Sequence, residues 1–87
     1  MDLLQLEHFL AVAEEGTFTR AAERVGRTQP AISQSIKKLE DELGMPLFAR
    51  DLHEVSLTEA GKALVEYARR MVRARDDAMR MLGSLKH

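Results

Sequence analysis

The chain has 87 residues, of which 31% are charged and 45% hydrophobic; this length leaves room for one domain, and the composition is globular rather than disordered. Cysteine is absent, which excludes a disulfide framework and a thiolate metal site, and no apolar run approaches the roughly 18 residues of a membrane span. The net charge is −1, but residues 17–40 hold five bases and two acids between two acidic segments, which predicts a local basic patch.

A first helix is predicted over residues 3–15. Leu3, Leu6 and Leu10 recur at helical spacing and therefore form one apolar face. Asp2 precedes this segment as an N-cap, and Gly16 follows it as a stop signal.

Two further helices are predicted over residues 18–25 and 29–43. Thr17 and Thr28 precede them as N-caps. Gly26 ends the shorter helix, and Pro30 lies in the first turn of the longer one, where its missing N–H costs nothing. The apolar face of the longer helix consists of Ile32, Ile36, Leu39 and Leu43.

The periodicity changes after Gly44 and Pro46, which together stop the third helix. Residues 47–57 are predicted to form two short strands joined by a turn near residues 51–53, because alternation replaces helical spacing there. Residues 58–86 are predicted to form one long helix with Thr58 as N-cap. A line of residues on this helix steps by four and three, which is a heptad seam: Leu64, Ala68, Met71, Arg75, Ala78, Leu82 and Leu85.

The two helices over residues 18–37, separated by about three residues, match the helix-turn-helix arrangement. Ala22 is small enough to let the second helix approach closely, Gly26 tolerates a positive φ in the turn, and Ile32 fills the corner between the helices. We therefore expect a helix-turn-helix within this part of the chain.

If the apolar face of helix 29–43 is buried, its opposite face points outward. That face carries amides, hydroxyls and one cation: Gln29, Pro30, Ser33, Gln34 and Lys37. Such side chains suit the major groove of DNA, since Gln pairs bidentately with adenine and Ser contacts base edges or phosphate. Lys37 is expected to contact phosphate rather than to read a base.

At this point the sequence resembles the N-terminal DNA-binding domain of the LysR-type transcriptional regulators. The matching segments are LEHFLAVAEEGTFTRAAERV, TQPAISQSIKKLEDELGMPLFAR and SLTEAGKALVEYAR, which cover about residues 4–70 in order. The resemblance implies a mostly α winged helix-turn-helix fold over residues 1–57, with a two-stranded β wing over residues 47–57. It also implies that residues 58–87 form a linker helix through which two subunits dimerise.

The resemblance further implies DNA contacts at positions that match the family's motif. Thr17 and Thr19 lie where the second helix approaches the DNA backbone, and Arg50 lies at a commonly basic position of the wing. Family members often carry Arg at the position of Gln34, so the basis for a guanine preference there is missing. The wing tip is normally rich in Arg, whereas here His53 is its sole potential cation; we expect weak wing contacts and a shallower salt dependence than is usual in the family.

Arg75 interrupts the otherwise apolar heptad seam. In a parallel coil it would be buried opposite its own copy, so we prefer an antiparallel homodimer, which the resemblance also implies. The alternative hypothesis is a helical module that binds protein without binding DNA, supported by the same seam and by three methionines on the last helix.

The sequence offers no pattern for catalysis or for a cofactor. His8, His53 and His87 lie in different segments with no ligand spacing, so no metal is expected, and His8 is predicted at the surface or rim of the domain. We expect a cytoplasmic, nucleoid-associated protein that is not an enzyme. We expect the chain to be an excised or stand-alone domain without the family's effector-binding domain, and we expect a small-molecule effector to act only through such a C-terminal domain.

Overall fold

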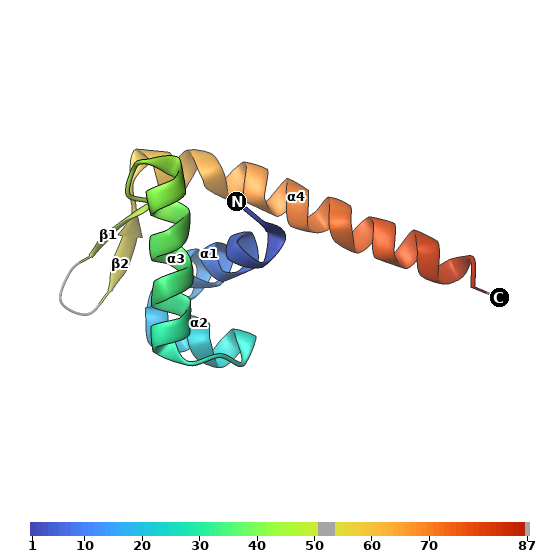
Figure 1. Cartoon of the computed structure of the whole chain (residues 1–87), viewed down its shortest axis with the longest axis horizontal. Helices are drawn as coiled ribbons and strands as arrows, with labels where there is room; N and C mark the ends of the chain where they lie inside the picture. Colours follow the sequence, from blue (N-terminus) through green and yellow to red (C-terminus); the bar gives the residue numbers. More distant parts are fainter. Residues whose placement is uncertain (51–53, 87) are drawn as a thin grey trace.

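The computed structural model describes residues 1–50 and 54–86. It contains four helices and a two-stranded sheet in that part of the chain, as predicted (Figure 1): α1 (Leu3–Glu15), α2 (Phe18–Val25), α3 (Gln29–Leu43), β1 (Phe48–Arg50), β2 (Val55–Leu57) and α4 (Glu59–Ser84). The first three helices have the predicted bounds, and α4 is slightly shorter than expected at each end. None of the helices in the described residues is long and apolar enough to cross a membrane.

All four predicted N-caps are confirmed. The side chains of Asp2, Thr17, Thr28 and Thr58 each accept a hydrogen bond from a backbone N–H in the first turn of the helix that follows. A cap of this kind stabilises a helix by about 1 kcal/mol. Local sequence signals therefore place the start of every helix in the described chain.

The core lies where α1, α2 and α3 meet beneath the hairpin. Phe9 is fully buried at its centre, with its ring 5.4 Å from that of Phe48, and Phe18 lies edge-on to Phe48 at 6.1 Å. Ile32 is also fully buried, as expected for the residue between the two helices of the helix-turn-helix. Gly26, between those helices, has the predicted positive φ of 70°.

The hairpin is joined to the body at its base. Its two strands are antiparallel, with Phe48 opposite Leu57. The Val55 N–H donates to the Gly16 carbonyl at 3.1 Å, which attaches β2 to the turn between α1 and α2. The wing therefore has a fixed base next to the core.

Helix α4 has two parts with different environments. Val65 and Ala68 in its first half are buried in the core, and Met71 is partly buried against it. The second half extends away from the body (Figure 1), and Met79 and Leu82 there are more than 60% exposed. One helix thus contributes to the domain core and also presents an apolar surface that this chain leaves uncovered.

Candidate nucleic-acid interface

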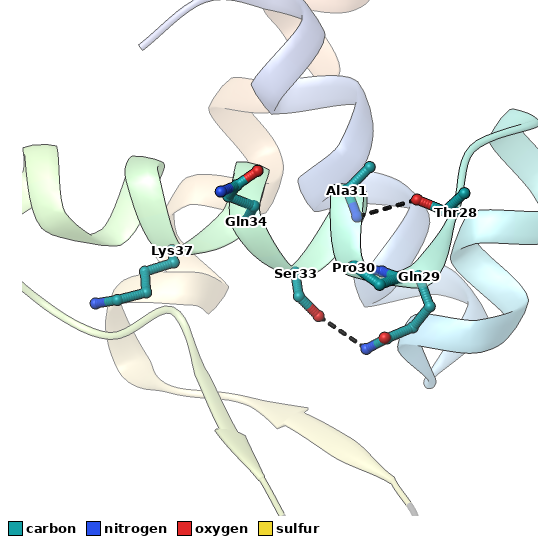
Figure 2. A pocket seen from close by; sticks show the side chains of 7 residues that line it. All are labelled: Thr28, Gln29, Pro30, Ala31, Ser33, Gln34 and Lys37. Atoms are coloured by element: carbon teal, nitrogen blue, oxygen red, sulfur yellow. Dashed lines mark hydrogen bonds between the residues drawn. The ribbon is translucent and has the colours of Figure 1, made fainter.

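Helix α3 is oriented by its apolar face. Ile32, Ile36 and Leu39 are completely buried, which forces the opposite face outward. That outward face lines a shallow groove of about 710 Å³ (Figure 2), formed by Thr28, Gln29, Pro30, Ala31, Ser33, Gln34 and Lys37. The five residues predicted to face outward are therefore brought together on one surface.

Two of these side chains are already paired with each other. The Gln29 Nε2 donates a hydrogen bond to the Ser33 Oγ at 2.8 Å, and Figure 2 shows both side chains on the same edge of the helix. Gln34 points to another side, is exposed, and forms no side-chain hydrogen bond within the described residues. Its amide is therefore free to pair with a ligand without breaking an internal bond.

The N-terminal end of α3 is electrostatically suited to an anion. Its first turn contains no acidic residue, so the partial positive charge of the helix terminus is not cancelled there. Lys37, about two turns further along the same face, pairs with the Asp41 carboxylate at 3.3 Å, and both side chains are largely exposed. An exposed pair of this kind contributes little energy, so Lys37 can exchange it for a phosphate.

The helix-turn-helix segment carries further cations. Arg20, Arg27 and Lys38 are exposed and form no ion pair within the described residues. Arg24, by contrast, contacts Glu14 at 2.8 Å and Glu15 at 3.3 Å, and its hydrogen bond to Glu14 raises the pKa of Arg24. The basic segment predicted from residues 17–40 therefore keeps three exposed cations without an ion pair in the described residues, one on α2, one between α2 and α3, and one on α3.

The prediction for His8 is wrong. His8 is buried, with 5% of its surface exposed, and its Nδ1 lies 2.8 Å from the Ser35 Oγ on α3. Burial lowers the pKa of His8, and the positive charge of Arg27 lowers it further. The spacing of apolar residues in α1 could not reveal this contact, since Ser35 is 27 residues away in the chain.

The comparisons with known proteins match this architecture. The family model described as "Bacterial regulatory helix-turn-helix protein, lysR family" matches residues 3–62. The chain belongs to the LysR family. It is 49% identical to the HTH-type transcriptional regulator BudR of Klebsiella aerogenes over 79 residues, which cover 91% of this chain and 55% of BudR.

Solved LysR-family structures have the same fold. A crystal structure of the CbnR DNA-binding domain with DNA has a TM-score of 0.91 and 34% identity, and a complex of the BenM DNA-binding domain with benA site 1 DNA has 0.91 and 35%. Each comparison covers all of both chains. The chain spans little more than half the length of the first curated relatives that it matches, 55% and 59%.

The remaining positions implied by the LysR resemblance lie on α2 and on the wing. Thr17 uses its hydroxyl oxygen to cap α2, accepting from the Arg20 N–H at 3.0 Å, and Thr19 is exposed in the first turn of α2. Arg50 lies in β1. The side chain of Arg50, the whole of His53 and the predicted turn of the wing lie outside the described residues.

Sequence reasoning missed the role of Glu40. Its Oε2 accepts hydrogen bonds from the Leu47 N–H at 2.7 Å and the Phe48 N–H at 3.4 Å, so a side chain of α3 holds the first residues of the wing. From the other side, the Thr58 N–H donates to the Leu47 carbonyl at 3.0 Å. The signal in the sequence was a single acidic residue on the edge of an apolar helix face, which is too common to interpret alone.

The predicted LysR-type dimer seam is divided by the protein's own packing. Leu64 and Met71 pack partly against the core, while Ala68 is completely buried in it, which leaves Ala68 no surface for a partner helix. The distal part of the seam is exposed: Ala78, Leu82 and Leu85. Arg75, at the boundary, contacts Glu7 of α1 and also lies 2.9 Å from the Asp76 carboxylate.

Among the described residues, no three His, Asp or Glu side chains gather closely enough to hold a metal ion. The acids near the interface are instead used in ion pairs and in backbone hydrogen bonds.

Proposed function

We propose that this chain is the DNA-binding domain of a transcriptional regulator and that it binds duplex DNA with α3 in the major groove. The observation that carries the proposal is the outward face of α3, which is polar, acid-free in its first turn and exposed as one shallow groove. An α-helix presented in this way fits the width of the major groove. LysR-family structures of the same fold were solved in complex with DNA, which supports the same conclusion.

Within this interface the residues have distinct roles. Gln29 and Gln34 read base edges through their amides, Ser33 contacts a base or a phosphate, and Pro30 packs against the groove wall. Thr17, Thr19 and Lys37 contact the DNA backbone, and the wing contributes through Arg50 and His53. Arg20, Arg27 and Lys38 add sequence-independent attraction to phosphate.

The test compares two variants on a library of random duplexes. We expect Gln34→Ala to change which sequences are preferred, with a loss of discrimination of about 1–3 kcal/mol at one position. Lys37→Ala is expected to weaken binding to all duplexes alike and to reduce the dependence of affinity on salt. Failure of the wild type to bind any duplex, at low as at high salt, would exclude the proposal and favour a protein-binding module.

The chain is proposed to bind DNA as a homodimer through the distal half of α4. Ala78, Leu82 and Leu85 leave an exposed apolar surface that a second copy in antiparallel orientation would cover. The dimer would present two copies of α3 to half-sites separated by about 34–36 Å or a multiple. Leu82→Glu should then give monomers in sedimentation, and an unchanged mass would remove this half of α4 as the interface.

The remaining features of the proposal concern the longer proteins to which this domain corresponds. We assign residues 1–57 to the winged helix-turn-helix part and residues 58–87 to the dimerisation segment. The relatives are transcriptional regulators, and we infer a cytoplasmic regulator without catalytic activity or cofactor. A small-molecule effector would act through a domain that follows this one.

A further inference from the structure

The charged residue in the dimer seam has a partner within its own chain. Arg75 reaches from α4 to the carboxylate of Glu7 on α1. Both side chains are about one-third exposed, at 34% and 32%, and the hydrogen bond to Glu7, followed by that to Asp76, raises the pKa of Arg75. The Arg75 side chain is therefore bound to α1 of its own protomer.

A second ion pair joins the same two helices. Arg69 of α4 lies 3.5 Å from the Glu14 carboxylate of α1. Glu7 and Glu14 are seven residues apart, which separates the two points of attachment by about 10 Å along α1. Between them, Leu10 of α1 and Val72 of α4 line the same groove. Two attachments separated in this way add to the packing of Val65 and Ala68 in the core and oppose rotation of one helix against the other.

Arg75 lies at the point where α4 leaves the body, so a change there would alter the angle between α4 and the body. On its N-terminal side α4 is packed against the body, and from residue 77 onward every described residue of α4 is exposed. The whole chain measures 51 × 25 × 19 Å. At a distance of 25 Å from α4, the middle dimension of the chain, a tilt of about 10° displaces an element by about 4 Å, more than the 3.4 Å rise of one base pair. A small change at this junction would therefore change the DNA register that a dimer can reach.

We propose that Glu7 and Arg75 sharpen the preference for one spacing between operator half-sites, by bracing the angle at which the dimerising half of α4 leaves the helix-turn-helix body. The proposal rests on the dimer proposed above. Neither residue needs to touch DNA, because both act through the placement of the two α3 helices. They are positioning residues, whose removal leaves the base-reading surface of each protomer intact.

The test uses the whole chain and duplexes that carry two copies of the half-site selected by the wild type. One duplex has the preferred spacing, two have spacings longer and shorter by one base pair, and one has a single half-site. Glu7→Gln, Arg75→Gln and the exchanged double variant Glu7→Arg/Arg75→Glu are compared with the control Arg80→Gln, whose ion pair with Asp77 lies within α4. Sedimentation gives the mass of every variant.

We expect each single variant to reduce the affinity ratio between preferred and altered spacings by about threefold, a size typical of exposed ion pairs. Binding to the single half-site and the dimer mass should stay unchanged, and the exchanged variant should recover the ratio. The proposal is overturned if the ratio does not change, if single half-site binding falls in parallel, or if a single variant is monomeric. A monomeric wild type would instead refute the proposed dimer itself, and this inference with it.

Discussion

Gly61 lies where α4 passes closest to the base of the wing, and its replacement by alanine tests that geometry. A Cβ added at this position would lie 2.2 Å from the Leu47 carbonyl oxygen and 2.8 Å from the Leu57 Cδ2. The leucine side chain can rotate, but the carbonyl belongs to the backbone. The Leu47 carbonyl accepts a hydrogen bond from the Thr58 N–H, and the Leu47 N–H donates to the Glu40 carboxylate. The backbone at Leu47 therefore cannot move without disturbing both hydrogen bonds.

Relief of the clash requires a displacement of about 1 Å, since non-bonded heavy atoms approach to little less than about 3.5 Å. Overpacking of this kind costs about 1–3 kcal/mol, and strain in the two hydrogen bonds at Leu47 adds to it. The higher helix propensity of alanine offsets at most about 1 kcal/mol of this cost. We therefore expect Gly61→Ala to lower the free energy of unfolding by about 1–3 kcal/mol and Tm by about 4–8 °C for each kcal/mol.

Gly83 provides the matched control in the same helix. A Cβ there meets no atom within 4 Å, so Gly83→Ala should raise the free energy of unfolding slightly, by about 0.5 kcal/mol. Both variants are unfolded with urea at several protein concentrations, so that dimerisation is separated from folding. Equal stabilisation by the two substitutions would show that α4 does not approach Leu47 as described.

Three further experiments test contacts around α3. The pKa of His8 is lowered in the folded chain, so below the ordinary histidine pKa of about 6.5 the unfolded chain binds more protons than the folded one. The Tm should therefore fall as the pH drops from 7 toward 5, and it should fall less in His8→Gln. Glu40→Ala leaves two N–H groups of the wing without their acceptor and should cost about 1–3 kcal/mol in urea unfolding, whereas the exposed Glu23→Ala should change stability by less than about 0.5 kcal/mol. Arg27→Gln and Lys38→Gln should each reduce the slope of log affinity against log salt by about 0.9 while the preferred sequence stays the same; an unchanged slope would place both cations away from phosphate.

Local rules account for the elements that the sequence predicts correctly. Asp2 and Thr28 are oxygen-bearing residues placed directly before an apolar periodicity, and Gly26 tolerates the positive φ that ends α2. Each signal acts within a few residues of its effect. The outward face of α3 follows from the same kind of rule, because burying Ile32 and Ile36 leaves the opposite face no alternative.

The tertiary structure alone decided how distant residues meet. His8 became buried because α3 covers it with Ser35, Glu40 found its partners across the turn into the wing, and Arg75 paired with Glu7 from 68 positions away. It also divided one heptad seam between the protein's own core, at Ala68, and an exposed surface, at Leu82. Helical periodicity states which residues share a face, whereas the element that covers that face depends on how the helices pack together in space.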